Sequence, residues 1–321
     1  MSAASLKKVP AVRIENSAPV YTNIDLSDRQ GVRIDVVSAS ICGSDLHMTS
    51  AGWAEGRVLG HEFAGRTADG RAVAIEPLDA CGHCRYCEDG QRSHCENGAD
   101  IVGVSLDGGM ARYAIVPEST LVPLPSGLDI SIASLVEPLA VALHGLNRAR
   151  WSIDDKVLIV GAGPIGLMCA AAIAARGGQC AITARHDHQR IAAEKLRASS
   201  DVADGYDLVF DAVGTTDSLA QAVQFARPQA RIGMLGSFWS PVQVDFGFCG
   251  KEIELIAATM YQRCTAGDWE FREAVEHLAK WPAIADALIT HRFPLEAAPE
   301  AFAVANDRAA GAIKVVFDAA E

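Results

Sequence analysis

A glycine-rich turn between a short apolar segment and an alanine-rich segment limits the possible folds of this chain most strongly. KVLIV, a predicted strand, is followed by GAGPIG, whose Gly161, Gly163 and Gly166 fit the pattern G-x-G-x-x-G ahead of a predicted helix. Gly161 permits a tight turn, Gly163 the close approach of a pyrophosphate, and Gly166 close packing of the helix on the sheet. With Pro164 and Ile165, the turn is predicted to hold the phosphates of a dinucleotide at the helix N-terminus.

Predicted strands and helices alternate around this turn. Up to about residue 120, short segments broken by Gly, Pro and Asp indicate β-strands, and from about residue 128 helical spacing alternates with short buried strands. This alternation predicts βαβ units, and therefore an α/β fold with a Rossmann doubly wound parallel sheet. The predicted strands are 31–40, 70–77, 111–120, 156–160, 179–184, 207–214, 231–238, 253–260 and 312–320; the predicted helices are 129–149, 164–176, 189–198, 218–226 and 271–281.

Length and charge exclude several classes of protein. The chain has 321 residues, which suggests two domains, and a formal net charge of −12. This acidic balance argues against nucleic acid as a partner and against an anionic membrane surface, because both need a basic face. The sequence shows no run of about 18 apolar residues and no apolar segment behind the N-terminal lysines, so neither a transmembrane helix nor a secretory signal is predicted. A cytoplasmic location is expected.

Four of the nine cysteines lie in one short segment, CGHCRYCEDGQRSHC. They are Cys81, Cys84, Cys87 and Cys95. The spacing C-x2-C-x2-C-x7-C is typical of zinc held by four thiolates, a closed site that is structural because no position remains for a substrate. The alternatives are an iron–sulfur cluster, whose fourth cysteine is spaced differently and followed by proline, and four unrelated thiols. His83 and His94 are expected to be solvated loop residues.

A second set of metal-ligand residue types is spread over three motifs. Cys42 lies in ICGSDLH, His61 and Glu62 lie in GHEFAG, and Glu137 lies in LVEPLAVALHG. A mixed set of sulfur, nitrogen and oxygen donors leaves one zinc position open, which indicates a catalytic metal that polarises an alcohol or carbonyl oxygen. Taken singly, a buried cysteine is more often a core residue and a glutamate on an apolar face a paired core carboxylate.

Together these motifs resemble the medium-chain zinc-containing alcohol dehydrogenases, and most closely their polyol branch, the sorbitol and threonine dehydrogenase-like enzymes. The resemblance covers nearly the whole chain and rests on ICGSDLH, GHEFAG, CGHCRYC, GGMARYAIVP, LVEPLAVALHG and GAGPIG. It implies a GroES-like catalytic domain over residues 1–137 and 264–321, with a structural zinc lobe at about 80–97. It also implies a Rossmann cofactor-binding domain over 138–263.

The resemblance assigns roles in the catalytic site. Cys42 and His61 are implied zinc ligands, and the third ligand is either Glu62 or Glu137. Ser44 is implied to pass the alcohol proton to a relay through His47. Asp45 is expected to orient the same loop, and the plainer explanation of all three polar loop residues is turn chemistry.

The end of the second Rossmann strand determines the choice of cofactor. The resemblance places the acid that binds both ribose hydroxyls of NAD at position 185, but this chain has Arg185 there, with His186 and Arg190 nearby. An arginine can bind a 2′-phosphate that a carboxylate would repel, so NADP(H) is predicted to be preferred, with NAD(H) possible. The alternatives are that Asp187 reaches the ribose or that Arg185 stacks on adenine.

Other residues are candidates for the walls of the two sites. Asp211, Val213 and Gly214 in FDAVG follow a predicted strand near the path of the cofactor. Trp53 and Met110 are candidates for the substrate cleft, with core packing as the plainer role.

The predicted reaction is reversible hydride transfer between a secondary alcohol, polyol or sugar-like, and a nicotinamide cofactor. A simple alcohol or a specialised ketone is the alternative substrate. A non-zinc reductase of the same superfamily would lack the ligand set, and a non-catalytic member would have lost a ligand or a glycine of GAGPIG. Two segments around GSFWSP and IELIAATM are a possible sheet-extending edge, and a homodimer or homotetramer is expected.

Overall fold

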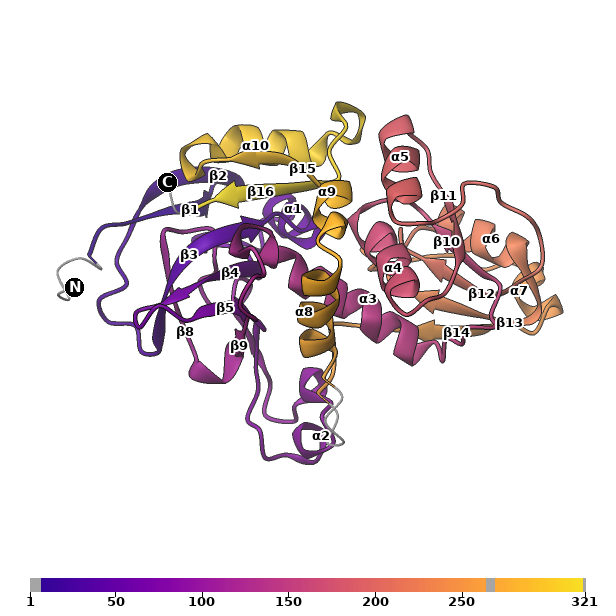
Figure 1. The fold of residues 1–321 in the computed structure, drawn as a ribbon, viewed down its shortest axis with the longest axis horizontal. Coiled ribbons are helices and arrows are strands. Elements are labelled where there is room, and N and C mark those ends of the chain that lie inside the picture. Colours follow the sequence, from indigo (N-terminus) through magenta and orange to yellow (C-terminus); the bar gives the residue numbers. More distant parts are fainter. Residues whose placement is uncertain (1–6, 264–268, 320–321) are drawn as a thin grey trace. The chain divides into compact units, whose positions relative to one another are not determined.

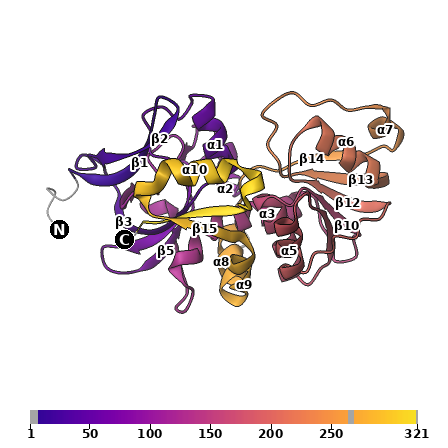
Figure 2. The ribbon, with the colours of Figure 1, turned by 90° about the horizontal axis from the view of Figure 1, so that it is seen from above.

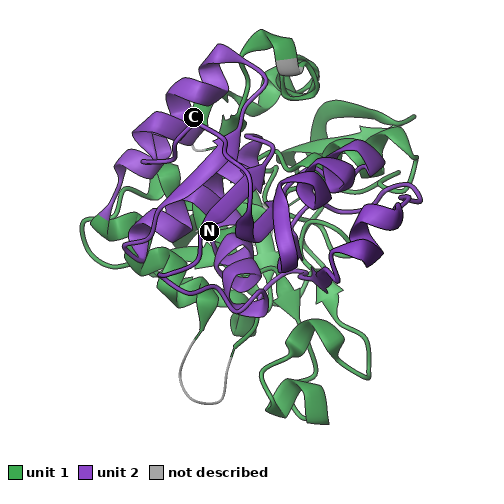
Figure 3. Cartoon of the chain, turned by 90° about the vertical axis from the view of Figure 1, so that its right-hand side faces the viewer, with its two compact units in different colours: residues 1–137, 262–280, 289–321 green, residues 138–261, 281–288 purple. Residues whose placement is uncertain are grey.

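The computed structural model describes residues 7–263 and 269–319, and the chain divides into two compact units (Figure 3). Unit 1 comprises Met1–Glu137, Gln262–Lys280 and Ile289–Glu321; unit 2 comprises Pro138–Tyr261 and Trp281–Leu288. The expected division put the segment 281–288 with the catalytic domain. It belongs to unit 2 instead, because α9 (Ala283–Leu288) packs on two helices of that unit. Residue 264, where the second catalytic segment was expected to start, lies outside the described residues.

Unit 2 is built on a parallel five-stranded sheet. Its order is β11 (Cys180–Thr183), β10 (Val157–Val160), β12 (Tyr206–Asp211), β13 (Ala226–Met234) and β14 (Glu254–Ala257). All four residues of β10 are buried because this strand lies inside the sheet with helices on both faces. A single parallel bridge from Ala181 to Ser199 continues the sheet beyond β11. The order in which strands are added to the sheet reverses between β10 and β12, and doubly wound sheets bind their ligands at such a point.

The helices of unit 2 cover this sheet (Figure 2). They are α3 (Val136–Arg148, beginning in unit 1), α4 (Pro164–Ala175), α5 (Asp187–Lys195), α6 (Thr216–Phe225), α7 (Phe246–Gly250) and α9. Helix α4 contacts β10, β11, α5 and α9, and its small side chains allow this close packing. The segment Ile130–Arg148 is long and apolar enough to cross a membrane, which the sequence reading did not anticipate. However, 78% of its apolar window is buried inside the protein, as in the core helix of a folded domain.

Unit 1 contains a seven-stranded, mainly antiparallel sheet (Figure 1). The path is β15 (Ile289–Phe293), β16 (Lys314–Asp318), β3 (Val32–Ser40), β4 (Glu62–Thr67), β5 (Ala72–Ile75) and β9 (Leu121–Pro123), with β8 (Tyr113–Val116) on β3. The C-terminal strand β16 thus pairs with β3, and Val316 lies opposite Ser40. This pairing brings the C-terminal part of the chain next to the segment that leads to Cys42.

The remaining elements of unit 1 surround the sheet. They are the hairpin β1 (Val9–Glu15) and β2 (Ala18–Ile24), the helices α1 (Gly43–Ser50), α8 (Glu270–Lys280) and α10 (Ala298–Asn306), and the short 3-10 turns η3 (Glu118–Thr120), η4 (Ile130–Leu135), η5 (Leu295–Ala297) and η6 (Arg308–Ala310). A separate lobe contains β6 (Leu78–Asp79), α2 (Arg85–Glu88), η2 (Arg92–His94) and β7 (Asp100–Ile101).

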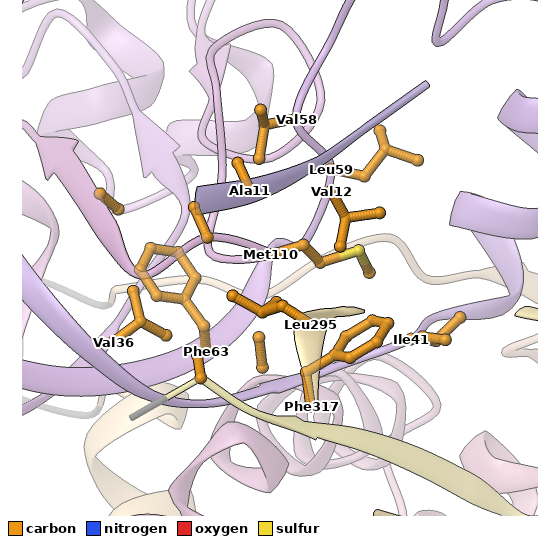
Figure 4. Packing of buried hydrophobic residues seen from close by; sticks show 14 of the residues in the cluster. Ala11, Val12, Val36, Ile41, Val58, Leu59, Phe63, Met110, Leu295 and Phe317 are labelled. Carbon is orange, nitrogen blue, oxygen red and sulfur yellow. The ribbon is translucent and has the colours of Figure 1, made fainter. Parts of the chain in front are cut away.

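The apolar core of unit 1 joins side chains from distant parts of the sequence (Figure 4). Phe63 of β4, Phe317 of β16 and Met110 are at most 1% exposed within it. Met110 was a candidate for the substrate cleft, but it is a core residue, because the backbone of residues 109–111 runs directly against Gly60 and β1. Trp53, by contrast, is 70% exposed.

Candidate functional site

Helix α1 places Cys42 and Asp45 beside His61. Cys42 caps the helix, and its backbone N–H donates to Asp45 Oδ2 at 2.8 Å. Asp45 Oδ1 lies 3.4 Å from Nδ1 of His61, and the Asp45 side chain is fully buried. A carboxylate at Nδ1 fixes the orientation of an imidazole and leaves Nε2 for a metal. Asp45 was expected to orient only its own loop; its contact with His61 spans two motifs and was missed.

Glu62 is held by a buried lysine. Lys314 Nζ of β16 donates to both carboxylate oxygens of Glu62, at 2.8 and 2.7 Å, and the Ser40 hydroxyl donates to Oε2. The two charged side chains are only 2% and 1% exposed. Burial lowers the pKa of Lys314, but the charges of Glu62 and Cys42 outweigh it and raise the pKa. Sequence reasoning missed Lys314, although a single lysine in an otherwise apolar predicted strand was a usable signal.

Glu137, in the first turn of α3, belongs to the same charged cluster. It is 7% exposed, and burial raises the pKa of its carboxyl to about 7, with the charge of His61 opposing and that of Glu62 adding to the shift. Lys314 and Asp45 also act on this carboxyl. The structure therefore brings together both carboxylates that were considered as the third ligand.

The donor atoms of this cluster fit a metal ion. One ligand atom each from Cys42, His61 and Glu62 lies within 4.8 Å of the others. Burial lowers the pKa of His61, but the Asp45 carboxylate and the Cys42 thiolate raise it well above its ordinary value. The cluster thus attracts positive charge at a place lined by sulfur, nitrogen and oxygen donors, as a zinc ion requires.

Ser44 and His47 lie three residues apart on α1, a spacing that puts side chains on the same side of a helix. Ser44 is half-buried and His47 is exposed. Ser44 follows Cys42 by two residues in the sequence.

The four cysteines of the lobe are gathered in space. The sulfur atoms of Cys81 and Cys87 are 3.9 Å apart, and those of Cys84 and Cys95 are 4.0 Å apart. Zinc–sulfur bonds of about 2.3 Å in a tetrahedron put the sulfurs about 3.8 Å apart, so the lobe fits a zinc ion.

The thiols of this lobe differ in their affinity for protons. The backbone N–H of His83 is the main cause that lowers the pKa of Cys81 to about 6, whereas burial raises the pKa of Cys87 to about 12. The His83 ring hydrogen-bonds to the Cys81 carbonyl at 2.7 Å, and both His83 and His94 are exposed. Both histidines therefore lie where loop residues were expected.

Each glycine of the turn is required for a different structural reason. Gly161 has φ +98°, and its N–H donates to the Thr183 hydroxyl at 2.9 Å. A Cβ on Gly166 would lie 1.9 Å from the Gly161 carbonyl oxygen, so the helix cannot pack with a larger residue. A Cβ on Gly163 would meet no protein atom within 4 Å. Pro164 and Ile165 form the first residues of α4 after this turn.

Arg185 is exposed at the entry to α5. The N–H groups of Arg185 and of His186, the N-cap residue, donate to the Gln189 side chain at 3.0 and 3.2 Å. Arg190 forms an ion pair with Asp187 and also donates to a backbone carbonyl. Asp187 is therefore held by Arg190. Of the two arginines, Arg185 is the one closer in sequence to the end of β11.

Asp211 organises the end of β12. Its Oδ1 accepts the N–H groups of Val213 and Gly214 at 2.9 and 3.0 Å, and its Oδ2 accepts the Ser218 hydroxyl at 2.9 Å. Burial raises the pKa of Asp211, and these donors oppose the rise. Since a Cβ on Gly161 would meet the Val213 side chain at 2.4 Å, the turns after β10 and β12 touch. The candidate cofactor residues that follow β10, β11 and β12 thus lie at the same edge of the sheet, formed by the carboxyl ends of these strands.

Comparison with known proteins identifies the family. Residues 28–126 match the alcohol dehydrogenase GroES-like domain, and residues 130–318 match the glucose dehydrogenase C-terminus. A curated relative, the 2-dehydro-3-deoxy-L-galactonate 5-dehydrogenase of Pseudoalteromonas atlantica, is 32% identical over 303 residues, covering 85% of this chain and 87% of that protein.

Solved structures agree. An alcohol dehydrogenase from Escherichia coli CFT073 in complex with NADH has a TM-score of 0.86, with 26% identity over 97% of this chain and 99% of that one. A zinc-binding dehydrogenase from Sinorhizobium meliloti 1021 bound to NADP has a TM-score of 0.84, with 25% identity over 97% of this chain and 99% of that one.

The chain is a zinc-type, nicotinamide-linked oxidoreductase with a GroES-like part and a Rossmann part. It belongs to the polyol branch of the medium-chain zinc-containing alcohol dehydrogenases. The predicted family, fold class and type of reaction are confirmed.

The two glycines of the turn should respond differently to alanine. Gly163→Ala adds a methyl group in space that is free of protein, so the melting temperature should stay unchanged while the affinity for NADPH falls. Overpacking costs about 1–3 kcal/mol, which corresponds to a loss of about 5- to 150-fold in affinity. Gly166→Ala, the matched control, should lower the melting temperature because its methyl meets a carbonyl oxygen. Calorimetry and fluorescence titration measure both effects; unchanged NADPH binding by Gly163→Ala would contradict this role.

Proposed function

We propose that this protein reversibly oxidises a secondary hydroxyl of a polyol or sugar acid with zinc and NADP(H). The main support is the cluster of Cys42, His61 and two glutamates in unit 1, together with an intact glycine turn in the Rossmann unit. The sugar-acid dehydrogenase from Pseudoalteromonas atlantica, at 32% identity, supports the substrate class. Two zinc ions per chain are proposed, one structural and one catalytic.

Glu137 is proposed as the third protein ligand of the catalytic metal, and Glu62 is the alternative. Glu62 is the carboxylate that lies within 4.8 Å of both other donors, yet both of its oxygens already accept from Lys314. Direct binding by Glu62 would have to weaken a buried ion pair, which is costly because Lys314 would lose its counter-charge. Glu137 offers a buried carboxyl whose charge a metal would favour.

The proposed chemistry divides between the bound groups and the chain. When bound, zinc would supply a Lewis acid for the substrate oxygen, and a nicotinamide cofactor would supply the hydride acceptor. Ser44 Oγ takes the hydroxyl proton and hands it to the His47 ring, which is exposed and releases it to solvent. Asp45 keeps His61 in place, and Lys314 keeps Glu62 oriented.

NADP(H) is proposed as the preferred cofactor because Arg185 is exposed two residues after Thr183, which contacts the glycine turn, while the neighbouring Asp187 is paired with Arg190. A guanidinium recognises a phosphate through two parallel hydrogen bonds. His186 and Arg190, at the start of α5, are proposed to contribute to the same subsite, and Val213 and Gly214 to line the cofactor path.

A homodimer in the cytoplasm is proposed as the working form. Strand β14 is the edge of its sheet, and an edge strand presents unpaired backbone groups that can pair with a second copy. Five large apolar side chains between residues 238 and 255 are at least 37% exposed in unit 2. They are Phe238, Trp239, Val244, Phe246 and Leu255. Antiparallel pairing of two β14 strands would cover them and extend the sheet across a two-fold axis.

Zinc content and activity together test the catalytic site. The wild type should hold about two zinc ions per chain and oxidise members of a panel of polyols and sugar acids. Glu137→Gln should retain about one zinc and lose at least about tenfold in metal affinity, the range typical of disturbed metal ligation. Inductively coupled plasma mass spectrometry after dialysis measures the metal, and cofactor absorbance measures the rate.

The matched control for this test is the double variant Glu62→Gln with Lys314→Met. It removes the ion pair without leaving a buried charge alone, and it should keep both zinc ions. Loss of one zinc by the double variant, with two retained by Glu137→Gln, would show that Glu62 is the ligand.

The cofactor preference rests on one side chain and can be reversed. Arg185→Asp should shift the ratio of kcat/KM for NADPH over that for NADH toward NADH by about 10- to 100-fold, because a charge-assisted hydrogen bond of about 1.5–3 kcal/mol is lost. Arg197→Asp, at an arginine 12 positions further along, is the control and should leave the ratio unchanged. A wild type that uses NADH better than NADPH contradicts the preference.

Sedimentation velocity tests the dimer. Leu255→Asp places a charge on the edge strand where two copies would meet, so it should convert the dimer to a monomer at micromolar concentration. Ile153→Asp changes an apolar side chain of unit 2 that is also exposed, at 56%, but lies outside the 238–255 segment. This control should keep the wild-type mass. A monomeric wild type is incompatible with the proposal.

A further inference from the structure

A buried carboxylate outside the catalytic cluster joins two arginines from separate segments. Glu76, directly after β5, is 1% exposed. Its Oε1 accepts from Arg92 at 3.1 Å, and its Oε2 accepts from Arg263 at 2.6 Å. The catalytic chemistry proposed above uses none of these three groups. Two guanidinium groups on one carboxylate leave a net charge of +1, and the Arg263 side chain, 37% exposed, keeps part of that charge in contact with water.

The first arginine belongs to the cysteine lobe. Arg92 opens η2, three residues before Cys95, and is 7% exposed. Its second terminal nitrogen donates to the Leu78 carbonyl at 3.0 Å, in the strand that leads into the lobe. Arg92 thus binds both Glu76 and the base of the lobe, and it orients the backbone from which the fourth cysteine projects.

The second arginine belongs to the segment that returns from unit 2. Arg263 lies two residues after Tyr261, where the first part of unit 2 ends. Its backbone N–H donates to the carbonyl of Gly90, between Cys87 and Cys95, at 2.9 Å. Its guanidinium lies 3.8 Å from the ring centre of Trp269, and Gln262 N–H donates to Glu270 at 2.6 Å. Arg263 is therefore attached to the lobe directly through its backbone, and through Glu76 and Arg92 by its side chain.

Contacts on both sides of Glu76 link these parts. The backbone of Arg263 is hydrogen-bonded to Gly90, which lies between Cys87 and Cys95, and Glu76 joins the side chain of Arg263 to Arg92. A metal that holds the four cysteines together also holds the backbone that carries them, and with it the Gly90 carbonyl and the Arg92 side chain. The link between the lobe and Arg263 should therefore depend on the metal.

We propose that Glu76 is a positioning residue that couples metal binding in the cysteine lobe to the position of Gln262 and Arg263. The proposal rests on the structural zinc of the proposed function. Such coupling is reciprocal: if loss of the Glu76 contacts weakens the lobe's hold on zinc, then removal of that zinc loosens Arg263 by the same free energy. The lobe with its metal then holds Gln262 and Arg263, the residues that follow the first part of unit 2, in place.

Zinc transfer to a chromogenic chelator tests one direction in the full-length protein. Zinc release from the lobe is identified as the kinetic phase that is missing in a Cys95→Ser variant, which lacks one of the four cysteines. In Glu76→Gln this phase should accelerate at least about tenfold, as for other groups that support metal ligands, while release of the catalytic zinc stays unchanged. Arg263→Met should have the same effect. The control is Arg85→Met, which removes the exposed Arg85–Glu96 ion pair of the same lobe and should change the rate less than twofold.

Hydrogen exchange tests the other direction. Removal of the lobe zinc from the wild type should increase exchange at the backbone N–H of Arg263, and it should have a smaller effect in Glu76→Gln, where the contact is already weakened. If Glu76→Gln lowers the melting temperature but leaves lobe zinc release unchanged, Glu76 only stabilises the fold and the coupling is refuted. A wild type without zinc in its lobe would refute both the coupling and the two-zinc proposal, whereas normal zinc content with unchanged release refutes the coupling alone.

Discussion

The ion pair between Lys314 and Glu62 is the interaction on which the catalytic unit depends. It joins the last strand of the chain to β4, on the opposite side of β3, in a place where both side chains are at most 2% exposed. Neither charge could remain there alone, because an unpaired buried ion costs several kcal/mol. The pair links β16 to β4 across β3, and β3 leads to the segment that ends at Cys42. It also occupies both carboxylate oxygens of Glu62.

The features that could be predicted from the sequence are those in which neighbouring residues act together. GAGPIG and the four-cysteine segment each contain their whole pattern within a few residues, so spacing alone indicates a turn for phosphate and a closed thiolate site. The alternation of strands and helices likewise predicts the parallel sheet. The short hairpin β1–β2, α9 and α10 were not predicted, because their sequences have weak periodicity and form through contacts with the rest of the domain.

What could not be predicted depends on pairs that are far apart in the chain. Lys314 is 252 residues from Glu62, and Arg263 is 187 residues from Glu76. No local pattern specifies such partners, since each requires the strand order to be known first. The same applies to Met110, whose place in the core follows from the path of its backbone against β1 and Gly60. The two candidate metal sites thus share one principle: local motifs supply the candidate ligands, and distant residues supply the charges that orient them.

Helix α9 has a consequence for how this protein can be divided or recombined. The chain leaves unit 2 at Tyr261, forms α8 in unit 1, and then returns for eight residues to place α9 on α4 and α5. A contiguous piece that ends at Tyr261 would contain the whole parallel sheet and the glycine turn but not Ile284 and Leu288, both fully buried. The cofactor unit is therefore not a cassette that one cut can excise. Exchange of this unit between relatives has to transfer two separate stretches of sequence together, and a graft that moves only the longer one leaves an apolar helix face open to water.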